Sequence, residues 1–174
     1  MDKLYFHIPS LQELSYRQRI LMDPDTMSYN ANYDINYEGY HKETGCIDLK
    51  REDWDSWFST WIDNMPNYFY AYITIKETNE FIGEVNLHYN KNSDWYEMGI
   101  VIEGKYRGYG YSLEALKKLL QVAFDKYQAK AVHNDFETSR KSAYKVHLDA
   151  GFKKIKDERN IVDLLINKND YKAL

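Results

Sequence analysis

The sequence predicts a single α/β domain spanning residues 1–174, with a mixed, largely antiparallel sheet of about seven strands flanked by helices. Seven short runs are expected to form strands, and two of them, 68–76 and 81–89, are rich in the aromatic and β-branched residues that favour strands. One pair of expected strands is joined through a helix, as parallel strands require, whereas most others can pair as hairpins. With 44% apolar and 29% charged residues, the composition is that of an ordinary globular protein with a hydrophobic core.

The N-terminal part begins with an expected strand from Leu4 to Ile8. Ser10 is a suitable N-cap for a helix that continues to about Met22. The segment Asp23-Pro24-Asp25 should end this helix, because a residue before proline is pushed out of the helical region. The polar stretch from Thr26 to Gly45 predicts a long ordered loop, and long loops in compact domains are often functional.

The segment from Lys50 to Met65 places its large apolar residues at helical spacing, which predicts a helix with an aromatic face. This face either packs on the core or contributes tryptophans to a ligand pocket. The residues concerned are Trp54, Trp57, Phe58, Trp61, Ile62 and Met65.

The remaining chain predicts six strands and two helices. The first of these helices has an apolar stripe from Leu113 to Tyr127, and the second is closed by Gly151 as a left-handed cap. Hairpin turns are expected around Glu77-Thr78-Asn79-Glu80 and Glu158-Arg159-Asn160. The expected strands cover residues 68–76, 81–89, 95–103, 131–136, 152–156 and 161–166, and the helices lie near 111–127 and 140–150.

Several classes of function are disfavoured by composition. The net charge is −4 and no dense Lys/Arg block is present, which argues against a nucleic-acid partner. Cys46 is the only cysteine, and the five histidines have no metal-ligand spacing, so neither a disulfide nor a metal site is expected. The N-terminus lacks a signal-peptide core and the run from Phe69 to Ile75 is too short to span a membrane, which predicts a cytoplasmic protein.

The segment Arg107-Gly108-Tyr109-Gly110-Tyr111-Ser112 lies where a strand is followed by a helix. Its glycines allow close backbone approach, and the free amides and dipole of the helix N-terminus favour a phosphate or pyrophosphate. Arg107 is expected to add a bidentate cationic contact. A glycine pair at such a position can also be only a turn. The segment is no Walker loop, and Leu113 occupies the third glycine position of a dinucleotide motif.

From Glu97 to Ser112 the strand and loop resemble the acetyl-coenzyme A motif of the GNAT acetyltransferase superfamily. The family pattern begins with Arg or Gln, has Gly three positions later, and has Gly or Ala two positions after that. Here Arg107 and Gly110 meet the pattern, and Ser112 in the last position is a mild departure. Residues 135–152 resemble the second family motif, a helix followed by Gly-Phe. The resemblance is strongest over 80–155 and weak before residue 50.

This resemblance implies an acetyl-CoA-dependent N-acetyltransferase with acetyl-CoA as cosubstrate. Residues 1–66 would form the acceptor side and 67–174 the acetyl-CoA-binding core. The strands at 95–103 and 131–136 would splay apart, leaving a slot for the thioester. The resemblance implies that the pantetheine arm contacts the backbones of Ile100, Val101 and Ile102. It implies that the pyrophosphate contacts the amides of Gly108, Tyr109, Gly110, Tyr111 and Ser112. Arg140, which stands in the place of a family Asn, joins the cofactor-binding set.

Acetyl transfer needs an unprotonated amine, and an alkylamine with a pKa of about 10.4 needs a base to deliver it at neutral pH. Glu97 is the first candidate, because many relatives carry a Glu on this strand; it is otherwise an ordinary exposed strand carboxylate. Glu84 on the neighbouring strand is the second candidate, and a Glu84–Glu97 pair would raise one pKa by like-charge repulsion. A backbone amide near Ile100 or Val101 would meet the oxyanion.

His147 stands four residues before Gly151, where many relatives place a tyrosine acid. It would protonate the departing thiolate, or it is simply a histidine favoured near a helix C-terminus by the dipole. On one helical stripe it joins Arg140 and Ala143. An alignment shifted by one residue brings Ser139 and Ser142 into the family Asn and Ser positions, with Val146 or Tyr144 nearby, but the Gly-Phe anchor favours the first alignment.

Acidic residues lie among the aromatic residues of 10–65, and together they can hold a cationic acceptor. The acceptor, a small-molecule or peptide amine, is left open among an aminoglycoside, a polyamine, an amino acid and a peptide N-terminus. A homodimer is plausible for this family. One rival interpretation is a non-catalytic acyl-CoA-binding protein of the same fold, and the presence of Glu97 argues against it. The other is a nucleotide- or partner-binding α/β domain, and the presence of Arg107, Gly108 and Gly110 argues against that.

Overall fold

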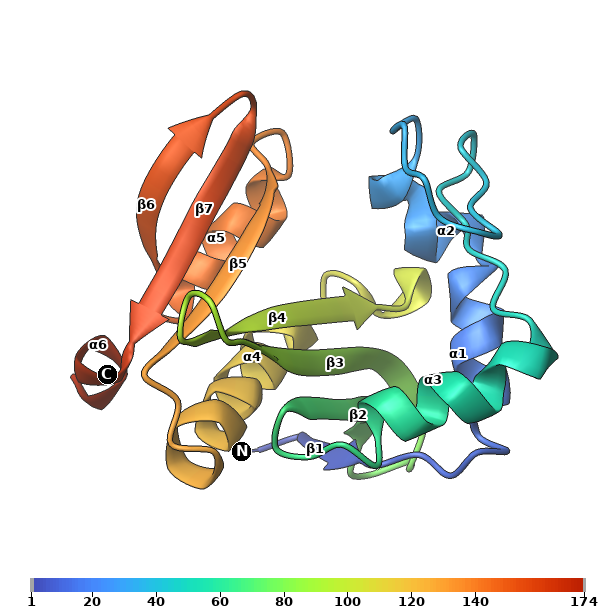
Figure 1. Ribbon diagram of the computed structural model, residues 1–174, viewed down its shortest axis with the longest axis horizontal. Coiled ribbons are helices and arrows are strands. Elements are labelled where there is room, and N and C mark those ends of the chain that lie inside the picture. The colour runs from blue at the N-terminus through green and yellow to red at the C-terminus, as the bar shows by residue number, and fades with distance from the viewer. Residues whose placement is uncertain (1, 174) are drawn as a thin grey trace.

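The computed structural model describes residues 2–173, and their seven strands form one sheet in the order β1-β2-β3-β4-β5-β7-β6 (Figure 1). The outermost residues of the expected domain, 1 and 174, lie outside this range. The predicted mixed α/β class is confirmed. The strands are β1 Leu4–His7, β2 Tyr68–Ile75, β3 Phe81–Asn90, β4 Trp95–Ile102, β5 Ala131–Glu137, β6 Lys153–Glu158 and β7 Ile161–Asn167. The helices are α1 Leu14–Leu21, α2 Pro24–Met27, α3 Trp54–Trp61, α4 Tyr111–Gln121, α5 Lys141–Asp149 and α6 Lys168–Lys172.

The two central strands are parallel and diverge. β4 and β5 pair only at Tyr96 with Val132 and at Glu97 with His133, whereas every other neighbouring pair is antiparallel. Figure 1 shows β4 running across the sheet while β5 rises away from it. The predicted splayed pair is therefore confirmed. From Met98 to Ile102, the side of β4 that faces β5 has no strand partner among residues 2–173.

Helices cover both faces of the sheet. On one face, Met98 of β4 and Val132 of β5 pack with Leu116 of α4 in the main hydrophobic core. On the other face, Tyr70 and Tyr72 of β2 pack against α1 and α3. In Figure 1, α3 passes in front of β2 and α5 lies behind β5 and β7. Because successive strand residues point to opposite faces, Glu97 faces the α1/α3 side and Met98 the α4 side.

Short elements account for the differences from the sequence prediction. The first helix begins at Leu14 rather than Ser10, because a turn precedes it; there the Glu13 carboxylate accepts hydrogen bonds from the Ser10 amide (2.8 Å) and hydroxyl (2.9 Å). The expected loop from Thr26 begins inside α2, which starts at Pro24 with Asp23 as its N-cap. The unpredicted α6 is capped by Asn167.

Candidate active site

The phosphate loop has the open geometry that its glycines predict. Gly108 and Gly110 adopt left-handed φ angles of +86° and +81°, and a Cβ added to either would meet nothing within 4 Å. Gly110 is the N-cap residue of α4 and offers no capping side chain, so the first amides of α4 are free for a ligand. Tyr109 is exposed and its ring stacks on Tyr111 at 6.0 Å between centroids. The loop thus leaves a backbone surface that an anion can approach.

Arg107 does not extend towards this surface. Its guanidinium donates hydrogen bonds to the carbonyl oxygens of Ile102 (3.2 Å), Asp25 (3.0 Å) and Thr26. The Thr26 hydroxyl in turn accepts a hydrogen bond from the Gly104 amide (2.9 Å). In this arrangement Arg107 ties α2 to the end of β4 and supports the loop from behind. The bidentate phosphate contact of Arg107 stays a prediction, and in this structure its guanidinium contacts carbonyl oxygens.

The free edge of β4 leads into this loop. Ile102 is buried in the α4-side core and Ile100 is half-buried against it, so their backbones rather than their side chains are available at the edge. On the opposite face, Gly99 lies so close to Asn86 that an added Cβ would be 2.5 Å from the amide nitrogen. The edge therefore combines unpaired backbone groups from Met98 to Ile102 with the open loop that follows.

Glu97 lies at the last paired position before β4 and β5 diverge, within a polar group that it shares with three other side chains. One carboxylate oxygen accepts hydrogen bonds from Trp95 Nε1 (2.6 Å) and Asn90 Nδ2 (3.1 Å). The other lies 2.5 Å from His133 Nδ1, and the Trp95 ring stacks on the His133 ring at 4.9 Å. His133 Nε2 is 3.8 Å from Asp163 Oδ1 of β7. We name Glu97, Trp95, Asn90 and His133 the Glu97 cluster.

The electrostatics of this cluster keep Glu97 ionised. Burial raises the pKa of Glu97, but the hydrogen bonds from Trp95, His133 and Asn90 outweigh it and hold the pKa below its usual value. Glu97 is therefore a carboxylate at neutral pH rather than a carboxylic acid. Sequence reasoning identified Glu97 but not Trp95, Asn90, His133 or Asp163, because their proximity depends on strand register.

Glu84 occupies a different environment from Glu97. In the β3–β4 register it lies opposite Val101, whereas Glu97 lies opposite His88, so the structure separates the two carboxylates. Glu84 is buried, and its oxygens accept hydrogen bonds from Arg17 of α1 and Tyr70 of β2. The Arg17 guanidinium also lies over the Trp57 ring at 4.7 Å. The structure assigns Glu84 to a buried ion pair that fastens α1 to the sheet, not to the expected Glu84–Glu97 pair.

His147 is buried on the α4/α5 side of the sheet, with 2% of its surface exposed. Its ring lies 5.1 Å from both Phe136 and Phe152, Nδ1 donates to the Ala143 carbonyl (2.8 Å), and Nε2 is 2.9 Å from Asn134 Nδ2. Burial lowers its pKa. With both nitrogens occupied and the ring buried, the imidazole has the environment of a neutral core histidine. The acid role remains a prediction that this arrangement does not favour.

Arg140 precedes α5 and contacts the segment that follows α2. Its guanidinium lies over the Tyr29 ring at 4.5 Å and the Phe136 ring at 5.3 Å, and it is 3.8 Å from Glu137. These contacts join the β5–α5 junction to the Ser28–Asn30 turn. Ser139 and Ser142 of the alternative alignment are both exposed.

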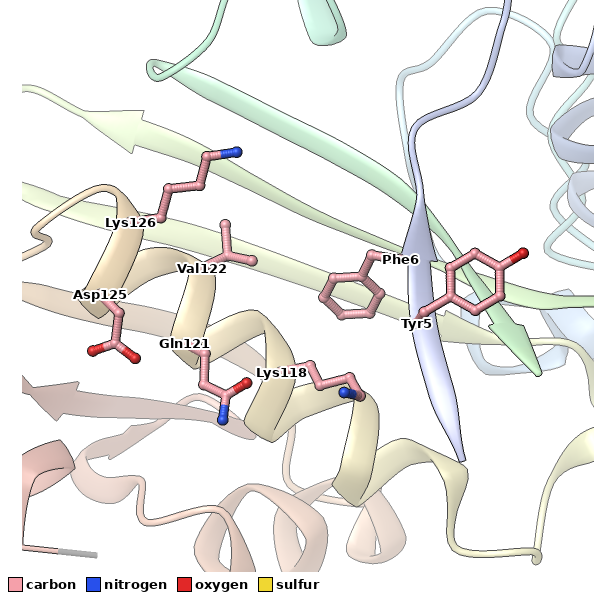
Figure 2. Close-up of a pocket in the computed structure, with 7 residues that line it drawn as sticks. All are labelled: Tyr5, Phe6, Lys118, Gln121, Val122, Asp125 and Lys126. Carbon is pink, nitrogen blue, oxygen red and sulfur yellow. The ribbon is translucent and has the colours of Figure 1, made fainter. Parts of the chain in front are cut away.

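Two cavities are lined by residues outside β4 and β5. One of about 390 Å³ is lined by Trp57, Trp61 and acidic residues that include Glu38 and Asp53. Trp57 and Trp61 also pack edge-on against Tyr70, so these tryptophans both cover the sheet and line a cavity. The other, of about 510 Å³, is an open depression between β1 and the C-terminal end of α4 with the helical turn Val122–Lys126 that follows it (Figure 2).

Within residues 2–173 no group of three or more His, Cys, Asp or Glu side chains is arranged to hold a metal ion. In the same part of the chain, no helix combines the length and the apolar character that a membrane crossing needs.

The splayed parallel pair, the unpaired edge of β4 and the glycine loop at the start of α4 define the class of the GNAT acetyltransferase fold. The family model described as acetyltransferase (GNAT) domain matches residues 10–153, and the chain belongs to this family. The resemblance found in the sequence is therefore confirmed.

Solved structures share this fold over nearly the whole chain. A GNAT-family acetyltransferase from Bacillus anthracis is 16% identical with a TM-score of 0.73, covering 96% of each chain. The spermidine N-acetyltransferase from Vibrio cholerae, solved with CoA and spermine, is 13% identical with a TM-score of 0.78 over 99% of each chain. FdhC, a nucleotide-linked sugar GNAT, is 16% identical with a TM-score of 0.71, covering 99% of this chain and 90% of its own. No curated protein matches the sequence.

Proposed function

We propose that the protein is an acetyl-CoA-dependent N-acetyltransferase that transfers an acetyl group to a primary amine of a small molecule or peptide by direct attack in a ternary complex. The observation that carries this proposal is the unpaired edge of β4 beside an open glycine loop at a helix N-terminus. An extended pantetheine arm can hydrogen-bond to such an edge, and a pyrophosphate can bind the free amides of Gly108 to Ser112.

The Glu97 cluster supports catalysis rather than binding alone. It places a carboxylate and an imidazole at the point where the strands diverge, next to the start of the free edge. An ammonium acceptor must lose a proton before its nitrogen can attack, and both groups accept protons. Backbone amides near Ile100 and Val101 would stabilise the oxyanion.

The acceptor side is proposed to be formed by residues 1–66. The cavity bordered by Trp57 and Trp61 also has Asp48 and Asp53 on its walls, besides a Glu38–Lys50 ion pair, and carboxylates beside aromatic rings suit an alkylammonium group. That the Vibrio cholerae neighbour was solved with spermine is compatible with an amine acceptor here. A homodimer and a cytoplasmic location stay predictions.

The test has two stages. Acetyl-CoA at 100 times its Kd should stabilise the fold by about 2.7 kcal/mol, or roughly 5–11 °C in Tm at 2–4 °C per kcal/mol, whereas ATP and NAD should not. An amine panel is then screened for thiol release from acetyl-CoA. Binding without thiol release from any amine would favour the alternative, a non-catalytic acyl-CoA-binding protein of the same fold. No shift with acetyl-CoA would overturn both functions.

A further inference from the structure

We infer that His133 is the catalytic base that removes the proton from the acceptor amine, and that Glu97 is a positioning residue that fixes the imidazole. This inference rests on the proposed function and names the residue that carries its proton-transfer step. It reverses the expectation from sequence, in which Glu97 accepts the proton directly.

The hydrogen bond between Glu97 and His133 fixes the tautomer of the ring. Glu97 Oε2 lies 2.5 Å from His133 Nδ1, and because an ionised carboxylate can only accept, Nδ1 carries the hydrogen. The lone pair of the neutral ring is then on Nε2. No hydrogen bond from residues 2–173 engages Nε2, and this nitrogen is not fully buried. A carboxylate holding Nδ1–H while Nε2 stays free is the arrangement by which a histidine acts as a general base.

The Trp95 ring also holds the imidazole in place, and two side chains hold Glu97. Trp95 stacks on the imidazole at 4.9 Å with an interplanar angle of 21°, and the same indole donates a hydrogen bond to Glu97 (2.6 Å). Asn90 donates to the same carboxylate oxygen. The orientation of the His133 ring therefore does not depend on a bound ligand.

Two carboxylates lie close to the ring nitrogen atoms of His133. Glu97 of β4 lies at Nδ1, and Asp163 of β7 lies 3.8 Å from Nε2; Lys156 of β6 is opposite Asp163 in the β6–β7 register. On the same face of β5, Asp135 is the next residue along the strand.

Glu97 is the weaker proton acceptor of the two. Three donors engage its two oxygens, which hold its pKa below the usual value. An imidazole has an ordinary pKa of about 6.5, much closer to the working pH of a general base. The location also fits, because Glu97 and His133 form the last pair between β4 and β5, and the free edge of β4 begins at the next residue.

His133 Nε2 takes one proton from the acceptor ammonium, which frees the nitrogen lone pair. The nitrogen forms a bond to the acetyl carbon, the carbon–sulfur bond breaks, and the sulfur leaves with the electron pair. The amide nitrogen loses a second proton, which the thiolate takes up, and His133 returns its proton to solvent. The products are an amide, a thiol and one proton.

The test compares His133→Gln, Glu97→Gln and the control His88→Gln, which replaces the histidine opposite Glu97 in the β3–β4 register. In the wild type, we expect kcat/KM to fall towards low pH as one group is protonated, and we call this decline the acid limb of the pH profile. His133→Gln should lower kcat/KM by about 10²–10⁴-fold and abolish this limb, with acetyl-CoA binding unchanged. Glu97→Gln should keep the limb but lower kcat/KM, because the carboxylate that orients the His133 ring is lost. His88→Gln should keep the wild-type profile.

Retention of the acid limb in His133→Gln would overturn the inference while leaving the proposed function intact. Acetyl-CoA binding without turnover in the wild type would overturn the proposed function and the inference with it. If His133→Gln does not fold, the His133 ring is titrated by NMR in the wild-type protein. A neutral ring with hydrogen on Nδ1 and a midpoint equal to that of the acid limb supports the inference, and a ring that carries hydrogen on Nε2 when neutral overturns it.

Discussion

Replacing Glu84 by Gln tests whether this carboxylate is a structural anchor or a second catalytic base. The Glu84 side chain is 4% exposed and pairs with Arg17, which is 17% exposed, while Tyr70 donates to the second oxygen. Glutamine keeps the volume but leaves the Arg17 charge buried without a partner. Breaking one side of a buried ion pair typically costs about 3–5 kcal/mol. At roughly 2–4 °C per kcal/mol for a chain of this size, Tm should fall by about 6–20 °C.

The assay is urea unfolding of Glu84→Gln, Arg17→Met and the double variant at one pH. Because each single variant leaves an unpaired buried charge, the double variant should lose less free energy of unfolding than the two single variants summed. Below the unfolding transition, Glu84→Gln should keep its kcat/KM within a few-fold of wild type. A loss of less than about 1 kcal/mol together with a collapse in kcat/KM would refute this reasoning and return Glu84 to the reaction.

Three further results are expected. Gly110→Val should raise the Kd for acetyl-CoA more than tenfold, and an unchanged Kd would refute the loop assignment; Asn160→Val, also at positive φ but in the β6–β7 turn, controls for backbone strain. Arg107→Lys should lower the free energy of unfolding by about 2 kcal/mol in urea titrations, since lysine cannot span the three carbonyls, and full stability would contradict the clamp. Burial lowers the pKa of His147, so as pH falls below about 6.5 the imidazole is protonated in the unfolded chain but stays neutral in the folded one, and the free energy of unfolding declines. His147→Gln should flatten this decline between pH 7 and 5. An unchanged dependence of the free energy of unfolding on pH would contradict the buried neutral ring.

Local patterns in the sequence were sufficient to predict the sheet. The seven strands were located to within one or two residues, because alternation of apolar residues and turn signals are short-range properties. The elements α2 and α6 were missed because four or five residues show no periodicity. They exist through their caps, Asp23 and Asn167, whose amide contacts lie within three residues.

The phosphate loop and Arg107 show where prediction of the site succeeded and failed. The positive φ angles of Gly108 and Gly110 follow from residue type and from the strand-to-helix position, so the loop was predictable. The direction of Arg107 was not, because its carbonyl partners at Asp25 and Thr26 are about 80 residues away in the sequence. A motif identifies which residue is present, but only tertiary packing decides which way a long side chain points.

The contact between Glu97 and His133 is decided by strand register. Alternation along the two strands puts each side chain on a face, but which residue lies opposite Glu97 depends on a parallel pairing of only two residue pairs. A slip of one residue would bring Val132 or Asn134 opposite Glu97, and both point to the α4 side of the sheet. The same short pairing leaves the edge of β4 free from Met98 onwards. The opening proposed to receive the pantetheine arm and the contact between the carboxylate and the imidazole are therefore two consequences of one feature, the early divergence of β4 and β5.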